Sequence, residues 1–142
     1  MINSTPILRY QQDLQRDDFH ADEAQHNAVK CLQRLFEELT QEQAPRSFWS
    51  TLLGSKAKKA RPQGLYFWGG VGRGKTYLVD IFYECLPFQN KMRIHFHRFM
   101  HRIHNELKAL DKQTDPLVTI AAKLAKETQI ICFDEFFVSD IT

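Results

Sequence analysis

The chain has 142 residues, of which 43% are hydrophobic, and its 19 basic and 17 acidic side chains leave a net charge of +2. This length suffices for one globular domain with a buried core, and a charge so near neutrality gives no sign of a nucleic-acid-binding protein. No apolar run approaches the roughly 20 residues of a membrane-spanning helix. Acidic residues at Asp13, Asp17 and Asp18 and the lack of an apolar stretch argue against a signal or transit peptide. We therefore expect a cytoplasmic protein.

The N-terminal 40 residues form a predicted helical segment. Residues 1–20 are polar with a weak helical pattern, and a firm helix follows, with Asp22 as its N-cap and Gln25 three positions later as in a capping box. Its predicted apolar face consists of Ala24, Ala28, Cys31, Leu32, Leu35, Phe36 and Leu39.

Residues 41–63 change in composition, with two prolines, a glycine and a basic stretch, and are interpreted as a linker. They include an amphipathic patch formed by Phe48, Trp49, Leu52 and Leu53. This patch either docks on a membrane surface or a partner, or packs on its own domain.

The third predicted part, residues 64–142, alternates strands and helices. An apolar run at 64–68 indicates a buried parallel strand, and the helix after the next loop ends before Pro87. A second strand is expected at 92–96, an amphipathic helix over 99–110, a third helix from the Asp115–Pro116 cap, and a last strand at 130–133. This order predicts an α/β fold, a parallel sheet with helices on both faces, whose strands end at one common edge.

Residues 69–76 read Gly-Gly-Val-Gly-Arg-Gly-Lys-Thr, which is a complete G-x-x-x-x-G-K-[ST] phosphate-binding loop between a predicted strand and a predicted helix. Glycines allow exposed backbone N–H groups to curl around an anion, and the following helix adds its N-terminal dipole. Lys75 is expected to reach the β- and γ-phosphates and Thr76 to ligate Mg²⁺. The residues expected to contact ATP are Gly69, Gly70, Val71, Gly72, Arg73, Gly74, Lys75, Thr76 and Tyr77.

An acidic pair, Asp134 and Glu135, directly follows the last predicted strand. At a strand end near a phosphate loop, an aspartate holds a magnesium-bound water. The adjacent Glu135 is then placed to polarise the attacking water as a general base. The sequence therefore predicts Mg²⁺-dependent ATP hydrolysis, with Lys75 and Glu135 as the catalytic residues.

Other reactive side chains have simpler interpretations. His95, His97, His101 and His104 lack a cysteine or carboxylate that completes a tetrahedral zinc site, so polar positions beside the active edge are favoured. Arg98 and Arg102 either face a phosphate or a neighbouring subunit, or are solvated. The three cysteines, which are far apart and odd in number, indicate reduced core residues: Cys31, Cys85 and Cys132.

Four stretches carry a resemblance to a known family: GLYFWGGVGRGKT, RIHFHRFMHRIHNEL, DPL and ICFDEFFVSDIT. Together they closely resemble the ZapE family of bacterial cell-division ATPases, which belong to the AAA+ class of P-loop NTPases. The resemblance implies that residues 69–76 are the Walker A loop and that Asp134 and Glu135 are the Walker B pair. It also implies a homo-oligomeric ATPase that associates with FtsZ at the septum and with the inner membrane, without nucleic acid.

The resemblance also defines what the chain lacks. Family members continue well past Thr142, with a sensor asparagine strand, an arginine finger, a fifth strand and a helical lid. In the AAA+ strand order 5-1-4-3-2, a strand beyond Thr142 separates the two Walker strands. We therefore expect an amino-terminal fragment with weak or no turnover. The alternative function is a helicase-loader-like ATP switch that binds single-stranded DNA.

Overall fold

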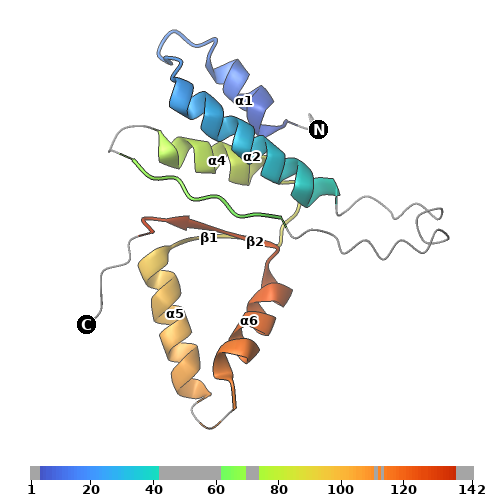
Figure 1. The fold of residues 1–142 in the computed structure, drawn as a ribbon, viewed down its shortest axis with the longest axis vertical. Helices are drawn as coiled ribbons and strands as arrows, with labels where there is room; N and C mark the ends of the chain where they lie inside the picture. Colours follow the sequence, from blue (N-terminus) through green and yellow to red (C-terminus); the bar gives the residue numbers. More distant parts are fainter. Residues whose placement is uncertain (1–3, 42–61, 70–73, 111, 113, 137–142) are drawn as a thin grey trace, which may run out of the picture. The chain divides into compact units, whose positions relative to one another are not determined.

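The computed structural model describes residues 4–41, 62–69, 74–110, 112 and 114–136, and its chain divides into two compact units, Met1–Pro87 and Phe88–Thr142. The described residues form five helices and a two-stranded sheet (Figure 1). The first unit contains α1 (Pro6–Asp13), α2 (Glu23–Gln41) and α4 (Lys75–Cys85). The second contains β1 (Lys91–His95), α5 (Phe96–Ala109), α6 (Pro116–Glu127) and β2 (Ile130–Asp134).

The three helices of the first unit pack on one another around an apolar core. Asp22 caps α2 as predicted, since its Oδ1 accepts a hydrogen bond of 2.9 Å from the N–H of Ala24. The side chain of Thr5 likewise caps α1, and Pro6 occupies the first turn, where its missing N–H has no consequence. The buried apolar side chains of these helices are Pro6, Tyr10, Val29, Leu32, Leu35, Leu39, Leu78, Ile81 and Phe82.

Several expectations for this unit are wrong. Ala24 and Cys31 lie on α2 but are exposed, whereas Val29 is buried, and Cys85 is half-buried rather than in the core. Residues 64–68 form an extended segment that is not a strand, and Tyr66 and Trp68 within it are 65% and 83% exposed. A strand needs a neighbouring strand to pair with its backbone, and within the part of the chain that the structure describes the paired strands are β1 and β2.

The second unit contains the parallel strand pair that the sequence predicts. β1 and β2 run parallel with Arg93 opposite Cys132 and His95 opposite Asp134, and the crossover between them contains α5 and α6. A cluster of phenylalanine rings, Phe96, Phe99, Phe133 and Phe136, packs α5 against the end of β2. Pro116 begins α6 as expected, but the Asp115 side chain makes no cap hydrogen bond, because its backbone is left-handed with φ 53°.

Some of the predicted features lie outside the described residues. These are positions 70–73 of the phosphate loop and residues 42–61, with the patch at 48–53 and the basic stretch. Among the helices that the structure describes, none combines the length and the apolar character required to cross a membrane. The predicted domain boundaries at residues 40 and 63 stay predictions.

Candidate functional site

The two ends of the phosphate loop meet in the first unit. Lys75 begins α4, and its Nζ donates a hydrogen bond of 2.7 Å to the carbonyl oxygen of Gly69, at the other end of the loop. Thr76 follows in the first helical turn and is exposed, so its hydroxyl is accessible to a ligand. The Lys75 ammonium is therefore bonded to the backbone carbonyl of Gly69, an acceptor that a phosphate oxygen can replace.

Gly74 is the position where the loop requires glycine most clearly. Its backbone is left-handed, with φ 71°, and it forms the N-cap of α4. A Cβ added there would lie 2.6 Å from Nε2 of Gln25, on the first turns of α2. The left-handed backbone therefore disfavours a side chain at this residue, and a Cβ there would also require the flexible end of the Gln25 side chain to move.

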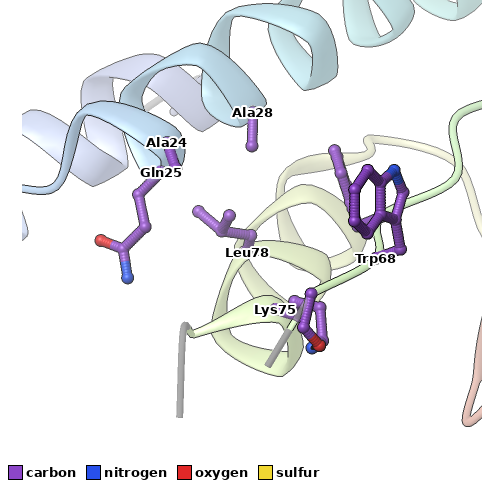
Figure 2. A pocket seen from close by; sticks show the side chains of 8 residues that line it. Ala24, Gln25, Ala28, Trp68, Lys75 and Leu78 are labelled. Carbon is purple, nitrogen blue, oxygen red and sulfur yellow. Dashed lines mark hydrogen bonds between the residues drawn. The ribbon is translucent and has the colours of Figure 1, made fainter. Parts of the chain in front are cut away.

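A pocket of about 450 Å³ opens beside the loop, entirely within the first unit (Figure 2). It is lined by residues of α2, of the extended segment, and of the loop and α4: Ala24, Gln25, Ala28, Phe67, Trp68, Gly69, Lys75 and Leu78. Its walls are mainly apolar and aromatic, with the Lys75 ammonium at one end. The pocket is open to solvent, since Trp68 in its lining is 83% exposed.

Gly69 and Lys75 were predicted from the sequence to lie in this site. The residues of α2 that line the pocket were not predicted. The position of Trp68, directly before the loop, was the signal that could have indicated an aromatic wall. No local signal places Ala24 and Gln25 there, because helix periodicity identifies a buried face without naming what covers it.

Tyr77 anchors the loop helix to the N-terminal helices. Its hydroxyl donates a hydrogen bond to Oδ2 of Asp13, and its ring packs against Phe19 at a centroid distance of 5.1 Å. Burial, reinforced by this hydrogen bond and the charge of Asp13, raises the pKa of Tyr77 far above its ordinary value. The phenol therefore stays protonated and holds the start of α4 against the segment that follows α1.

The acidic pair lies in the second unit, where β2 ends. Both oxygens of Asp134 accept hydrogen bonds from Arg93 of β1, at 2.8 Å from Nε and 3.0 Å from Nη2. This fork and its charge lower the pKa of Asp134, although burial acts in the opposite direction. Glu135 follows as an exposed residue with a left-handed backbone, φ 51°. The chain therefore departs from the direction of β2 at this residue.

The donor atoms at these positions suit Mg²⁺ chemically. Oxygen atoms are its preferred ligands; Thr76 carries a hydroxyl in the first unit, and Asp134 carries a carboxylate in the second unit. An ionised carboxylate offers about four lone-pair positions, so the two bonds from Arg93 leave others unused. In the described part of the chain, no group of three or more histidine, cysteine or acidic side chains is arranged to hold a metal ion.

Arg102 has a structural role that the sequence did not predict. It joins α5 to α6 through Glu127, at 2.7 Å, and pairs with Glu106 on its own helix at 2.8 Å. The hydrogen bonds that Arg102 donates to the carboxylates of Glu127 and Glu106 raise the pKa of Arg102 above its ordinary value. This engagement removes one of the few features that favoured a single-stranded DNA module, whereas Arg98 is exposed.

Comparison with known proteins gives the family. The model of the family described as AFG1-like ATPase matches residues 4–142. The chain belongs to the AFG1-like ATPase family. Cell division protein ZapE of Escherichia coli strain K12 is 46% identical to it over 100% of this chain and 40% of that relative. This finding confirms the resemblance to the ZapE family.

Two eukaryotic relatives widen the family. A Schizosaccharomyces pombe protein is 33% identical over 99% of this chain and 38% of its own length. Lactation elevated protein 1 homolog B of Danio rerio is 43% identical over 60% of this chain and 19% of its own length. The chain thus spans about 40% of the length of the ZapE relative that it matches. No solved structure matches it.

Proposed function

We propose that this chain forms the nucleotide-binding part of a Mg²⁺-dependent ATPase that acts in cell division. The observation that carries the proposal is the complete phosphate-binding loop at residues 69–76, whose Lys75 ammonium lies 2.7 Å from the carbonyl oxygen of Gly69 in the lining of a pocket of about 450 Å³. Membership of the AFG1-like ATPase family and the similarity to a cell division protein support it.

The geometry suggests how ATP would bind to the first unit. The phosphates follow the backbone N–H groups of the loop and the N-terminus of α4, where the helix dipole favours an anion. Lys75 exchanges the Gly69 carbonyl, now 2.7 Å away, for the β- and γ-phosphate oxygens. The base then lies against the apolar wall that Trp68 and Ala24 provide, which orients the triphosphate along the loop.

Hydrolysis would depend on the residues that hold charge and water. Thr76 and Asp134 would hold Mg²⁺, which when bound neutralises the negative charge that develops on the phosphates. Glu135 accepts a proton from the attacking water, as its exposed carboxylate at the strand end permits. The reaction needs no covalent intermediate with the protein, because positioning and charge neutralisation supply the rate enhancement.

Two substitutions in the full-length protein test this function. Lys75→Ala should weaken ATP binding at least tenfold, since it removes a charge-assisted contact, whereas Glu135→Gln should keep binding and abolish turnover. Lys30→Ala provides a matched control, because it removes an exposed lysine of α2. Unchanged turnover in Lys75→Ala would refute the proposed function.

By similarity to ZapE, we further propose that the protein is cytoplasmic and homo-oligomeric, and that it associates with FtsZ and the inner membrane at the septum. The amphipathic patch around Trp49 is the candidate docking segment in the sequence. FtsZ pull-down with wild-type protein and with Trp49→Ala separates this role from ATP binding. We expect Trp49→Ala to lose capture of FtsZ while its affinity for ATP stays unchanged. If the wild-type protein captured no FtsZ, the proposed partnership would be contradicted.

A further inference from the structure

The Asp134 carboxylate, which sequence reasoning assigns to a metal, is engaged by an arginine in this structure. Arg93 contacts both carboxylate oxygens, at 2.8 Å and 3.0 Å, and the two side chains are only 21% and 22% exposed. Bidentate arginine–carboxylate pairs of this kind are among the stronger hydrogen-bonded ion pairs. The pair is also more shielded than the surface ion pair between Arg16 and Asp18, whose side chains are 63% and 71% exposed.

The register of the sheet explains why this arginine reaches this aspartate. Arg93 lies opposite Cys132 and His95 lies opposite Asp134, so Arg93 and Asp134 are diagonal neighbours on the same face of the parallel pair. A diagonal neighbour lies within reach of a long side chain. The planar guanidinium bonds the two carboxylate oxygens from two separate nitrogens, Nε and Nη2. The single nitrogen of an ammonium cannot reproduce this pair of parallel bonds.

A guanidinium on Asp134 has a consequence for a divalent cation at the same carboxylate. Two cations that share one carboxylate repel each other, and the repulsion is larger at a partly buried site than in bulk water. A metal-bound water that approaches Asp134 is restricted to the lone-pair positions that the two bonds from Arg93 leave unused. The fork therefore opposes metal binding in the conformation described.

We propose that Arg93 competes with Mg²⁺ for the Asp134 carboxylate and thereby raises the Mg²⁺ concentration that is needed to bind the metal at this carboxylate. This inference rests on the proposed ATPase function, since it assigns Asp134 to the metal. Arg93 is then a positioning residue that acts through Asp134. When the metal is absent, Arg93 neutralises the aspartate; metal binding requires the fork to loosen.

The test measures nucleotide affinity rather than turnover. The probe is mant-ATP, titrated into the full-length protein in EDTA and over a series of Mg²⁺ concentrations. Arg93→Ala should lower the half-saturating Mg²⁺ concentration about threefold to tenfold, the range expected for loss of a partly shielded ion pair. Arg93→Lys keeps the charge without the fork, so it should give a smaller decrease, and it serves as the deciding variant if Arg93→Ala does not fold.

Two controls isolate the mechanism. Arg102→Ala removes another ion-paired arginine of the same unit and should leave the half-saturating Mg²⁺ concentration unchanged. In an Asp134→Asn background the effect of Arg93→Ala should vanish, because the two changes act through one interaction.

The possible failures are distinguishable. A half-saturating Mg²⁺ concentration that is unchanged or higher in Arg93→Ala would overturn the competition, and so would an equal decrease in Arg102→Ala. Wild-type protein that binds mant-ATP neither in EDTA nor with Mg²⁺ would instead refute the proposed function, and the inference with it.

Discussion

Replacing Gly74 with alanine is the sharpest perturbation of the phosphate loop that the structure allows. Gly74 combines a left-handed backbone, φ 71°, with a Cβ position only 2.6 Å from Nε2 of Gln25. Gly64 provides a matched control ten positions earlier, because a Cβ there meets no atom within 4 Å. The same chemical change is therefore made once at a constrained glycine and once at an open one.

The expected difference follows from three contributions. Left-handed backbone costs a residue with a Cβ about 1–2 kcal/mol, and moving the flexible end of Gln25 into a poorer rotamer adds about 0.5–1.5 kcal/mol. Alanine returns about 0.4–1 kcal/mol by restricting the unfolded chain. Gly74→Ala should therefore lower the free energy of unfolding by about 0.5–3 kcal/mol, whereas Gly64→Ala should leave it unchanged or slightly raised.

Urea denaturation of both variants, followed by circular dichroism, measures the difference, and ATP titration shows whether the loop still binds. Adding Gln25→Ala to Gly74→Ala should recover only the side-chain part of the loss, because the backbone strain remains. If Gly74→Ala proved as stable as Gly64→Ala, the assigned left-handed conformation and the close approach of α2 would both be wrong.

Two further predictions concern two cysteines, one in each unit, and an ion pair of the second unit. Cys31 is exposed, whereas Cys132 is buried and its pKa is raised to about 11. A thiol reagent should therefore label Cys31 quickly and Cys132 only during local opening of the structure. Cys31→Ser should remove the fast phase of labelling, and equal labelling rates for the two cysteines would contradict the assigned burial. The pKa of Glu106 is lowered, chiefly by its hydrogen bond from Arg102. The ionised carboxylate therefore contributes to the free energy of unfolding at pH values above the ordinary glutamate pKa. This contribution to stability is lost as the pH falls through the lowered pKa. Glu106→Gln should thus reduce the free energy of unfolding at pH 7 by an amount that shrinks as the pH falls below about 4.3, and a difference independent of pH would contradict the pairing.

Local signals predicted the elements well where the determinants lie close together in sequence. The cap at Asp22, the proline at the start of α6 and the strand before Asp134 each depend on a few neighbouring residues. The extended segment at residues 64–68 was predicted as a buried strand because its composition is that of one. A strand also needs a hydrogen-bonding neighbour, and no local pattern supplies that information.

The sequence by itself determined the phosphate-binding loop, the acidic pair and the family, because these depend on residue types at fixed short spacings. Only the tertiary structure showed that α2 forms a wall of the pocket beside Lys75, and that Arg93 bonds Asp134 across 41 positions. Such contacts depend on helix packing and strand register, which bring distant side chains within a few ångströms. The resulting arginine fork changes the physical description of Asp134 from an open ligand to one already paired with a cation.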